Sequence, residues 1–296
     1  SPEKPILVDE FLADAVELDV DAVSDGEDVL IGGIMEHVEE AGVHSGDSSC
    51  VIPPRSLSDE TMARVREVTE DIAKALDTVG LLNVQLAVRD GDDAEGGDVF
   101  VLEANPRSSR TVPFVSKATG VPIAKLAAKV IAGNSLSDLG VEEGVPEQYS
   151  VKEVVLPFDR LPDSDPRLGP EMKSTGEVMG TASTFGKAYE KAQSAAANEL
   201  PDAGTAVVDL DVDGFGEYYD LVEFEDVPEA IRRGEIDLLV TDDPDALRAA
   251  VREEVPYFST AASARAALDA LAHRDDDIDV LPVSERPIRA EKWGGE

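Results

Sequence analysis

At residues 101–107 the chain reads Val-Leu-Glu-Ala-Asn-Pro-Arg, an apolar strand that ends in polar side chains. Glu103 and Asn105 are two residues apart, so on a strand both side chains leave the same face of a sheet. Side-by-side carboxylate and amide oxygens suit Mg²⁺, a hard cation that is commonly shared with phosphate groups. Arg107 and Arg110 follow, and guanidinium groups beside a metal neutralise charge in phosphoryl transfer. These residues predict a metal and phosphate site, although taken alone they also fit a strand that ends in a polar turn.

The residues around this stretch predict an antiparallel sheet. Strands are expected at Asn83–Val88 and Asp98–Glu103, joined by a polar, glycine-rich loop, and Gln85 on the first of them would supply a third oxygen ligand. Earlier, Glu17–Val23 alternates acidic and apolar residues, which indicates a strand with one buried face. After a turn, Asp28–Ile34 is expected to return as the second strand of a hairpin.

Helices are expected on this sheet. The first, roughly Ser58–Val79, is followed by Gly80 as a stop signal, and the second, Val121–Ala132, begins with a proline. The apolar stripe of the first helix comprises Val65, Val68, Ile72, Leu76 and Val79. Residues 136–200 are less regular, apart from a short helix near Phe185–Ala197.

After Pro201 the pattern changes, and predicted strands alternate with predicted helices. This order predicts a small parallel sheet covered on both faces, with Ile236–Thr241 as its central strand and Thr205–Val212 beside it. The other expected elements are the strand Pro256–Phe258 and the helices Pro228–Arg233, Asp243–Glu254 and Ala261–Ala272. The fold class is therefore α/β, with an antiparallel unit over residues 1–135, a connecting region over 136–200 and a small parallel unit over 201–296.

The composition excludes several classes of protein. Hydrophobic residues make up 42% of the chain, which is enough for a core, and no apolar run approaches the ~18 residues that span a bilayer. The formal charge is −37 and is spread over the whole chain, which we interpret as adaptation to strong salt and which disfavours nucleic-acid binding. Cys50 is the only cysteine, so no internal disulfide forms. No signal peptide is visible, the chain starts at Ser1 rather than Met, and a cytoplasmic location is expected.

Three long runs resemble the carbamoyl-phosphate synthase large-chain family. They are residues 31–48 (Ile-Gly-Gly-Ile-Met-Glu-His-Val-Glu-Glu-Ala-Gly-Val-His-Ser-Gly-Asp-Ser), 103–120 (Glu-Ala-Asn-Pro-Arg-Ser-Ser-Arg-Thr-Val-Pro-Phe-Val-Ser-Lys-Ala-Thr-Gly) and 169–180 (Gly-Pro-Glu-Met-Lys-Ser-Thr-Gly-Glu-Val-Met-Gly). The resemblance covers about residues 5–190 and is closest to the second synthetase unit, which phosphorylates carbamate. It implies the C-terminal subdomain of an ATP-grasp site over residues 1–135. The unit after residue 201 weakly resembles a shortened methylglyoxal-synthase-like domain.

The resemblance also implies roles for individual residues. Glu17 would contact the ATP ribose, with Glu10 and Leu12 near the adenine. Catalytic roles would fall to Arg107, Arg110 and His44, the two arginines holding the carbamate or the transferred phosphoryl group. The nucleotide would be lined by Gly42, Val43, His44 and Ser45. The Mg²⁺ or Mn²⁺ ions that bridge the ATP phosphates would be bound by Gln85, Glu103 and Asn105.

The implied function is an ATP-dependent carbon–nitrogen ligase that makes carbamoyl phosphate for arginine and pyrimidine synthesis. Its partners would be the rest of the large chain and a glutamine amidotransferase small subunit. Because the chain begins inside one of the two lobes of the site, we expect weak nucleotide binding and no turnover from this chain alone. Two alternatives are an ATP-grasp carboxylase of the biotin carboxylase type and a non-catalytic regulatory fragment. In the small unit, Asp242 and Asp243 lie near the expected phosphate position at Ser259 and Thr260, so nucleotide effectors should bind poorly there.

Overall fold

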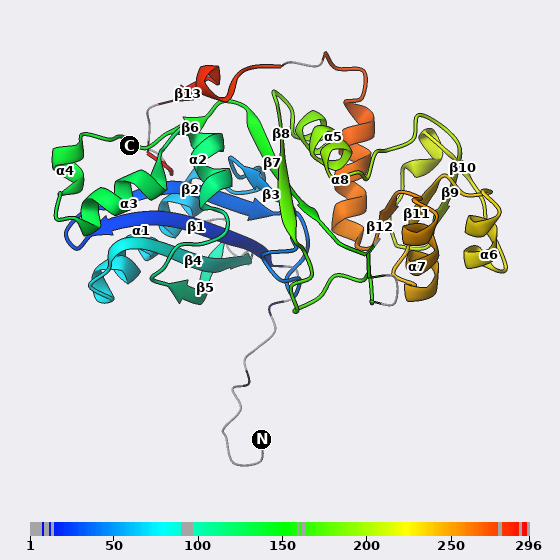
Figure 1. Cartoon of the computed structure of the whole chain (residues 1–296), viewed down its shortest axis with the longest axis horizontal. Coiled ribbons are helices and arrows are strands. Elements are labelled where there is room, and N and C mark those ends of the chain that lie inside the picture. The colour runs from blue at the N-terminus through cyan, green and yellow to red at the C-terminus, as the bar shows by residue number, and fades with distance from the viewer. Residues whose placement is uncertain are drawn as a thin grey trace.

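A computed structural model of the chain describes residues 8, 12, 15–89, 97–158, 160–161, 164–277, 280–289 and 292–294. A large antiparallel sheet and a small parallel sheet form the two ends of the molecule, with helices between and around them (Figure 1). A pair of two-residue strands, β6 (Val145–Pro146) and β13 (Ile288–Arg289), forms a third sheet. No helix in the described ranges is long and apolar enough to cross a membrane.

The large sheet has seven strands in the order β5-β4-β1-β2-β3-β7-β8, and every neighbouring pair is antiparallel. The four predicted strands are present, each longer than expected. Strands β3, β7 and β8 were not predicted. In β7 the apolar pattern is interrupted by two consecutive charged residues, Lys152 and Glu153, although both are buried. The strands are β1 (Val16–Asp25), β2 (Val29–His37), β3 (Cys50–Ile52), β4 (Val79–Arg89), β5 (Asp98–Asn105), β7 (Tyr149–Val155) and β8 (Gly176–Ala182).

The prediction that β1 buries only one face is wrong. Asp19 and Asp21, on the acidic face, are 3% and 1% exposed, so they are buried almost as deeply as the apolar residues on either side of them. Both carboxylates accept a hydrogen bond from the Asn83 side chain, and further donors reach each of them. Buried acidic groups persist when they are hydrogen-bonded in this way.

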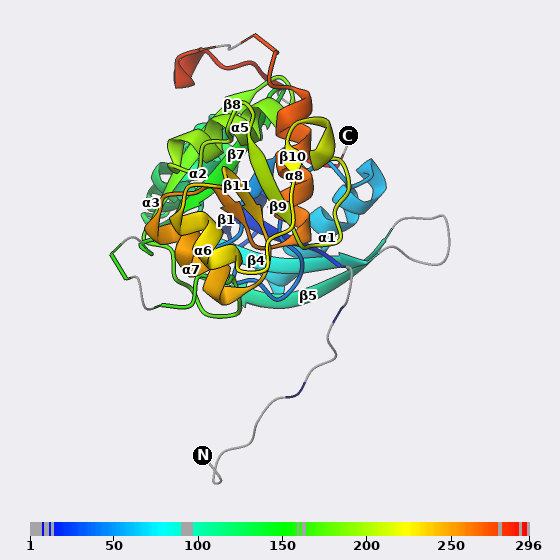
Figure 2. The same ribbon diagram turned by 90° about the vertical axis from the view of Figure 1, so that its right-hand side faces the viewer.

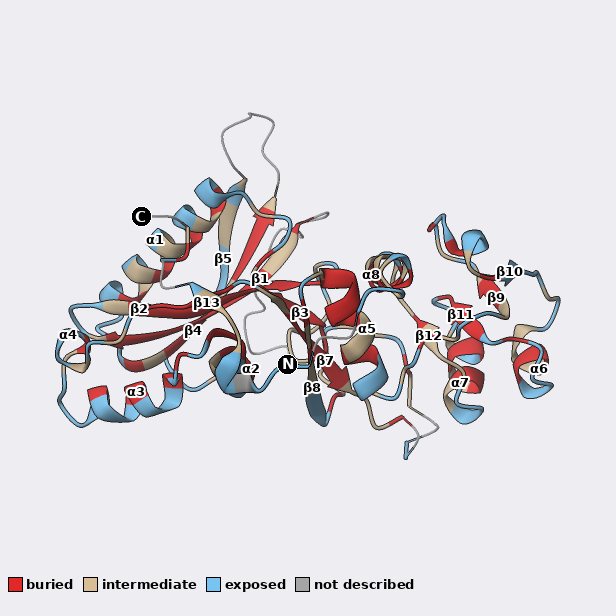
Figure 3. Ribbon diagram, turned by 90° about the horizontal axis from the view of Figure 1, so that it is seen from above, coloured by how far each residue is buried: buried red, intermediate tan, exposed pale blue. Residues whose placement is uncertain are grey.

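Helices cover both faces of the large sheet. Figure 3 shows α1 (Asp59–Ala75) on one side and α2 (Val112–Thr119) and α3 (Ile123–Ile131) on the other. Gly32 and Gly33 of β2 permit close contact with the second pair, since a Cβ on Gly33 would lie 2.7 Å from Val115 Cγ1, and one on Gly32 would collide with Ile123. The short helix α4 (Leu136–Leu139) follows α3.

Helix α1 is shorter than predicted. Its C-cap is Leu76, and the chain reverses through Asp77 at a φ of 50° before β4 begins at Val79. Leu76 and Val79 are 50% and 55% exposed, so they do not extend the buried stripe. The buried members of that stripe are Thr61, Val65, Thr69 and Ala73. Three of the four are small or polar, and a search for apolar spacing passes over them.

The small sheet confirms the predicted parallel α/β unit. Its strand order is β10-β9-β11-β12, all parallel, with β11 between β9 and β12 as expected. Val207 and Leu239 face α6 and α7, whereas Ala206, Leu238 and Val240 share a core with α8 (Figure 2). Helix α8 also packs on α5, which lies on β7 and β8. The elements are α5 (Phe185–Ala195), β9 (Thr205–Val208), η1 (Phe215–Glu217), β10 (Asp220–Leu221), α6 (Val227–Arg232), β11 (Leu238–Val240), α7 (Pro244–Arg252), β12 (Tyr257–Phe258) and α8 (Ala261–Ala272).

The C-terminal residues return to the large sheet. After η2 (Val283–Glu285), β13 pairs with β6, and Trp293 joins the core of the large sheet at 1% exposure. Strand β13 and Trp293 therefore lie at the large-sheet end of the molecule. The division of the chain into 1–135, 136–200 and 201–296 stays a prediction.

Candidate active site

The predicted metal ligands lie on adjacent strands. Gln85 of β4 is directly opposite Glu103 of β5, and Asn83 is opposite Asn105. Directly paired residues point to the same face, so Gln85, Glu103 and Asn105 share one face as the sequence predicted. Among the described residues, neither Glu103 nor Asn105 has a side-chain hydrogen bond, and Glu103 is exposed. Their oxygens are thus available to a ligand.

The donor chemistry fits a hard divalent cation. One carboxylate and two amide oxygens suit Mg²⁺, which usually takes few protein ligands and completes its shell with water and phosphate. The Gln85 amide nitrogen donates to Ser45 Oγ at 2.8 Å, and this orients the amide group. Within the described residues there is no group of three or more His, Cys, Asp or Glu side chains that would hold a metal without such amide ligands.

The loop formed by residues 42–48 lies over the same face of the sheet. Ser45 contacts Gln85, and its carbonyl oxygen is 3.5 Å from the buried Lys152 Nζ. The Gly42 amide lies 3.4 Å from Glu17 Oε1. His44 Nδ1 accepts a hydrogen bond from the Gly46 amide at 2.9 Å. The structure therefore brings together the loop, the start of β1 and the strands that carry the predicted metal ligands. Val43 is half-buried within the loop.

The two predicted arginines are on the segment that follows β5. Arg107 and Arg110 are exposed, and Arg110 contacts the sulfur of Met172. Arg107 donates to the neighbouring Ser108 carbonyl at 3.1 Å. Neither guanidinium group forms an ion pair with a carboxylate in the described part of the chain, so both are free to bind an anion.

The two residues predicted to lie near the adenine are close to the start of the chain. Leu12 is half-buried outside any regular element, and Glu10 lies outside the described residues.

Sequence reasoning missed several buried polar residues of β1 and β2 that lie near the predicted site. His37 lies between two carboxylates, 3.0 Å from Asp19 Oδ2 and 3.5 Å from Glu17 Oε2. Burial favours the neutral form of Asp19, but hydrogen bonds from His37 and Asn83 and the charge of Lys152 outweigh it and lower the pKa of Asp19.

Asp21, in contrast, has only neutral hydrogen-bond donors among the residues that the structure describes. Burial raises the pKa of Asp21 to about 6, although hydrogen bonds from Thr111, Ser109 and Asn83 act in the opposite direction. The hydrogen bonds from Thr111 Oγ1 and Ser109 Oγ are 2.6 and 2.7 Å long. They connect β1 to the segment that carries both arginines.

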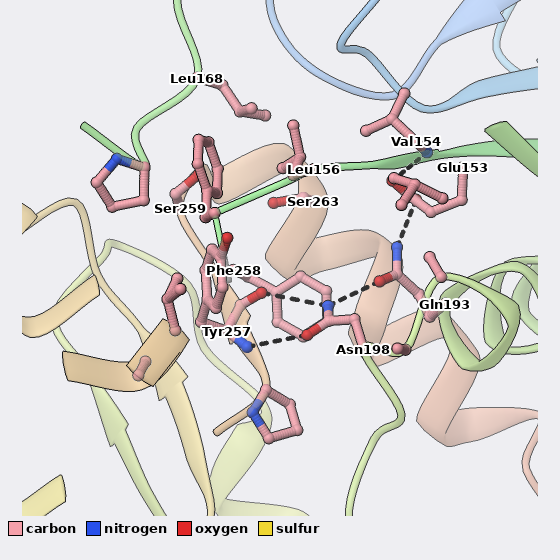
Figure 4. A pocket seen from close by; sticks show the side chains of 18 of the residues that line it. Glu153, Val154, Leu156, Leu168, Gln193, Asn198, Tyr257, Phe258, Ser259 and Ser263 are labelled. Carbon is pink, nitrogen blue, oxygen red and sulfur yellow. Dashed lines mark hydrogen bonds between the residues drawn. The ribbon is translucent and has the colours of Figure 1, made fainter. Parts of the chain in front are cut away.

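A cavity of about 690 Å³ lies between β7, α5 and β12 (Figure 4). Glu39 and Glu153, both deeply buried, are part of its wall, and Gln193 donates to Glu153 Oε2 at 2.5 Å. Burial and the neighbouring Glu153 raise the pKa of Glu39 to about 8, and burial also raises the pKa of Glu153. Sequence reasoning missed this cavity, because its walls combine residues from separate segments of the chain, such as Glu39, Glu153 and Tyr257.

The cavity and the loop of residues 42–48 share Asp47. Its side chain lines the cavity and accepts hydrogen bonds from the amides of Lys173 and Ser174 at 2.7 and 2.9 Å. The run 169–174 is thereby held against the loop, and the Gly169 carbonyl accepts a hydrogen bond from the His44 amide at 2.8 Å.

Comparison with known proteins gives a consistent result. The family model described as carbamoyl-phosphate synthase L chain, ATP binding domain, matches residues 2–139. A carbamoyl phosphate synthase large chain of Halobacterium salinarum is 71% identical over 99% of this chain, and one of Methanosarcina acetivorans is 47% identical over 96%. This chain spans only 28% and 30% of those two relatives. It spans 82% of a Methanosarcina barkeri large chain to which it is 49% identical over 96% of its own length.

Among solved structures, the biotin carboxylase domain of a single-chain bacterial carboxylase matches with a TM-score of 0.51. The match covers 64% of this chain and 49% of that one, at 15% sequence identity. The similarity extends to the fold alone, so the biotin carboxylase alternative is supported only as a shared architecture.

Proposed function

This chain belongs to the carbamoyl-phosphate synthase large-chain family, and from that premise we propose that it carries the metal-binding half of an ATP-grasp site that phosphorylates carbamate. A carbamate oxygen attacks the γ-phosphorus of ATP, the bond to the β–γ bridging oxygen breaks, and carbamoyl phosphate and ADP are released. The observation that carries the proposal is the pairing of Gln85 with Glu103, with Asn105 on the same face. The intact protein would be an ATP-dependent carbon–nitrogen ligase of arginine and pyrimidine synthesis.

Different residues of the site would bind the metal ion, the transferred phosphoryl group and the nucleotide. Gln85, Glu103 and Asn105 would hold Mg²⁺ or Mn²⁺, which when bound neutralises charge on the ATP phosphate oxygens. Arg107 and Arg110, exposed and without ion pairs among the described residues, would hold the carbamate and the transferred phosphoryl group.

His44 would act as a hydrogen-bond donor in the neutral form. Its Nδ1 accepts from the Gly46 amide, so the proton of the neutral ring is on Nε2 and can be donated to a phosphoryl oxygen. The amides of Gly42, Val43 and Ser45 would line the phosphates, since backbone N–H groups approach oxygen closely. Glu17 would bind the ribose, with Leu12 and Glu10 beside the adenine.

The proposal includes partners that supply the missing parts. The other lobe of the site and the first synthetase unit would come from the rest of the large chain, and ammonia from a glutamine amidotransferase small subunit. The location would be the cytoplasm. The charge of −37 would keep this protein dispersed in a salt-rich cell.

The test uses the intact large chain and the reverse reaction, in which ADP and carbamoyl phosphate give ATP and carbamate. Glu103→Gln keeps the size of the side chain and removes its charge, so we expect the rate to fall by about 100-fold or more. Asp98→Asn, on the same strand and also exposed, is the matched control and should retain the rate. An unchanged rate in Glu103→Gln would refute the proposal and favour a non-catalytic regulatory fragment.

A second binding function is favoured by the cavity at Glu39 and Glu153. Its volume of about 690 Å³ is in the range of small-molecule sites. Two buried carboxyl groups close together are costly, and an ammonium group between them would offset that cost. We therefore propose that the cavity binds a small ligand that carries an ammonium group.

Calorimetry on the intact large chain with L-lysine and L-norleucine tests this second function. The two amino acids have similar shapes, but only lysine has a side-chain ammonium group. Binding of lysine that is absent for norleucine and weakened about tenfold or more in Glu153→Gln would support the site. Equal behaviour of the two amino acids, or of Glu153→Gln and the exposed control Glu177→Gln, would argue against it.

A further inference from the structure

The carboxylate of Asp21 links three parts of the active face. Oδ2 accepts a hydrogen bond from Thr111 Oγ1 at 2.6 Å, and Oδ1 accepts from Ser109 Oγ at 2.7 Å and from Asn83 Nδ2 at 2.9 Å. Asn83 belongs to β4 and is directly opposite Asn105. One buried side chain thus joins the centre of β1, the strand β4 that also carries Gln85 and the segment after β5.

Arg110 lies between the two hydroxyl residues that Asp21 holds. Its own side chain is exposed, whereas Thr111 is buried and Ser109 is half-buried. Because residues on both sides of Arg110 are tied to the same carboxylate, its backbone cannot shift without breaking a short hydrogen bond. Hydrogen bonds to an ionised carboxylate are about twice as strong as those between neutral groups.

A purely structural role does not account well for an aspartate at this position. Asp21 is 1% exposed, its donors are all neutral, and the neighbouring charged group Asp19 is also acidic. A carboxylate buried without a cationic partner carries a desolvation cost that an asparagine would not. An aspartate rather than an asparagine stands here despite that cost, which suggests a use in holding the segment rigidly.

We infer that Asp21 is a positioning residue for phosphoryl transfer, which fixes the backbone of Arg110 through Ser109 and Thr111. The inference rests on the proposed function, since it needs Arg110 to act on the transferred group. Precise placement of such a group matters because displacement by about 1 Å costs a reaction as much as 100-fold in rate.

The test measures the reverse reaction of the intact large chain in Asp21→Asn, Thr111→Val and Thr111→Ser. Asp21→Asn and Thr111→Val should lower kcat by about 10- to 100-fold while KM for ADP changes by less than about threefold, since neither residue touches the nucleotide. Thr111→Ser keeps the hydroxyl and should stay close to wild type. The double variant Asp21→Asn/Thr111→Val should be no slower than the slower single variant, because both changes break the same link.

Arg110→Ala separates failure of this inference from failure of the proposed function. If Arg110→Ala retains the wild-type rate, the proposed function is wrong and Asp21 has nothing to position. If Arg110→Ala is inactive while Asp21→Asn and Thr111→Val keep wild-type kcat, Asp21 is only structural and the inference is overturned. Effects of Asp21→Asn and Thr111→Val that multiply, rather than overlap, would overturn it as well. Circular dichroism melts in the same buffer identify any variant that is not folded. If Asp21→Asn does not fold, Thr111→Val tests the same link, because valine has the shape of threonine and lacks only the hydroxyl.

Discussion

The carboxyl groups of Glu39 and Glu153 meet at the hydroxyl of Ser49, whose Oγ is 2.5 Å from Glu153 Oε2 and 3.4 Å from Glu39 Oε1. The Ser49 amide also donates to Glu39 Oε2 at 2.7 Å. All three residues are buried at the cavity wall. Two acidic groups in such a place cannot both ionise freely, and the pair therefore makes the stability of the protein depend on pH.

Glu39→Gln should flatten the fall in stability between about pH 4.5 and about pH 8. The folded-state pKa of Glu39 is raised to about 8, well above its value in an unfolded chain. The stability contributed by the protonated form is therefore complete in acid and is lost as the pH rises through about 8. Thermal melts from about pH 6 to about pH 9 should show a smaller fall in midpoint for Glu39→Gln than for wild type. The exposed neighbour variant Glu40→Gln should follow wild type, and identical slopes for Glu39→Gln and wild type would contradict the buried pair.

Trp293→Ala should destabilise the first unit. Trp293 is the single tryptophan, is 1% exposed and packs in the core of the large sheet, and its amide lies 3.4 Å from Glu143 Oε2. Removing a buried tryptophan side chain costs about 3–5 kcal/mol. Urea unfolding followed by circular dichroism should show this loss, with the exposed Glu285→Gln as control. A loss below about 1 kcal/mol would mean that the C-terminal residues are not anchored there.

Salt should stabilise this protein strongly. A net charge of −37 repels itself over about 10 Å at 0.1 M salt but over only about 3 Å at 1 M. Thermal melts from about 0.1 M to about 3 M KCl should show a steep rise in midpoint. The same midpoint at every concentration would overturn the interpretation of the acidic surface.

Nucleoside monophosphates should bind poorly to the small sheet. An amide in the first turn of each of the helices α8 and α7 already has an internal acceptor. Thr260 Oγ1 accepts from the Ser263 amide at 3.1 Å, and Asp243 Oδ2 accepts from the Ala246 amide at 3.1 Å. Calorimetry with UMP and IMP at about 3 M KCl should detect no micromolar binding. Binding in that range that disappears in Thr260→Ala would show that a phosphate displaces the cap.

The local sequence pattern predicted most helices and strands, including the two strands that carry the proposed metal ligands. It did not predict the buried polar residues that pack beside those ligands. Strand alternation placed Glu103 and Asn105 correctly, because a side-chain period of two is a local property. His37 was missed because β1 and β2 shift register at Asp21 and Ala22. Counting back from the hairpin turn pairs Glu17 with residue 36, and only the extra residue at the bulge brings His37 beside it.

Buried charges were the second source of error. The alternating pattern predicted that Asp19 and Asp21 face solvent. Their burial was missed because it depends on hydrogen-bond donors such as Asn83 and Thr111, which lie far away in sequence. The helical spacing of apolar residues in α8, in contrast, predicted its bounds of Ala261–Ala272 without error, because its burial follows a regular helical stripe.

The most direct test of the central claim is the binding of Mn²⁺ to the metal ligands themselves. Free Mn²⁺ can be followed by electron paramagnetic resonance during titration of the intact large chain with ADP present. In Glu103→Gln we expect at least one class of bound ions to lose about 10- to 100-fold in affinity, while Asp98→Asn keeps the wild-type curve. The same number of ions bound with the same affinity in Glu103→Gln and wild type would show that Gln85, Glu103 and Asn105 do not form a metal site.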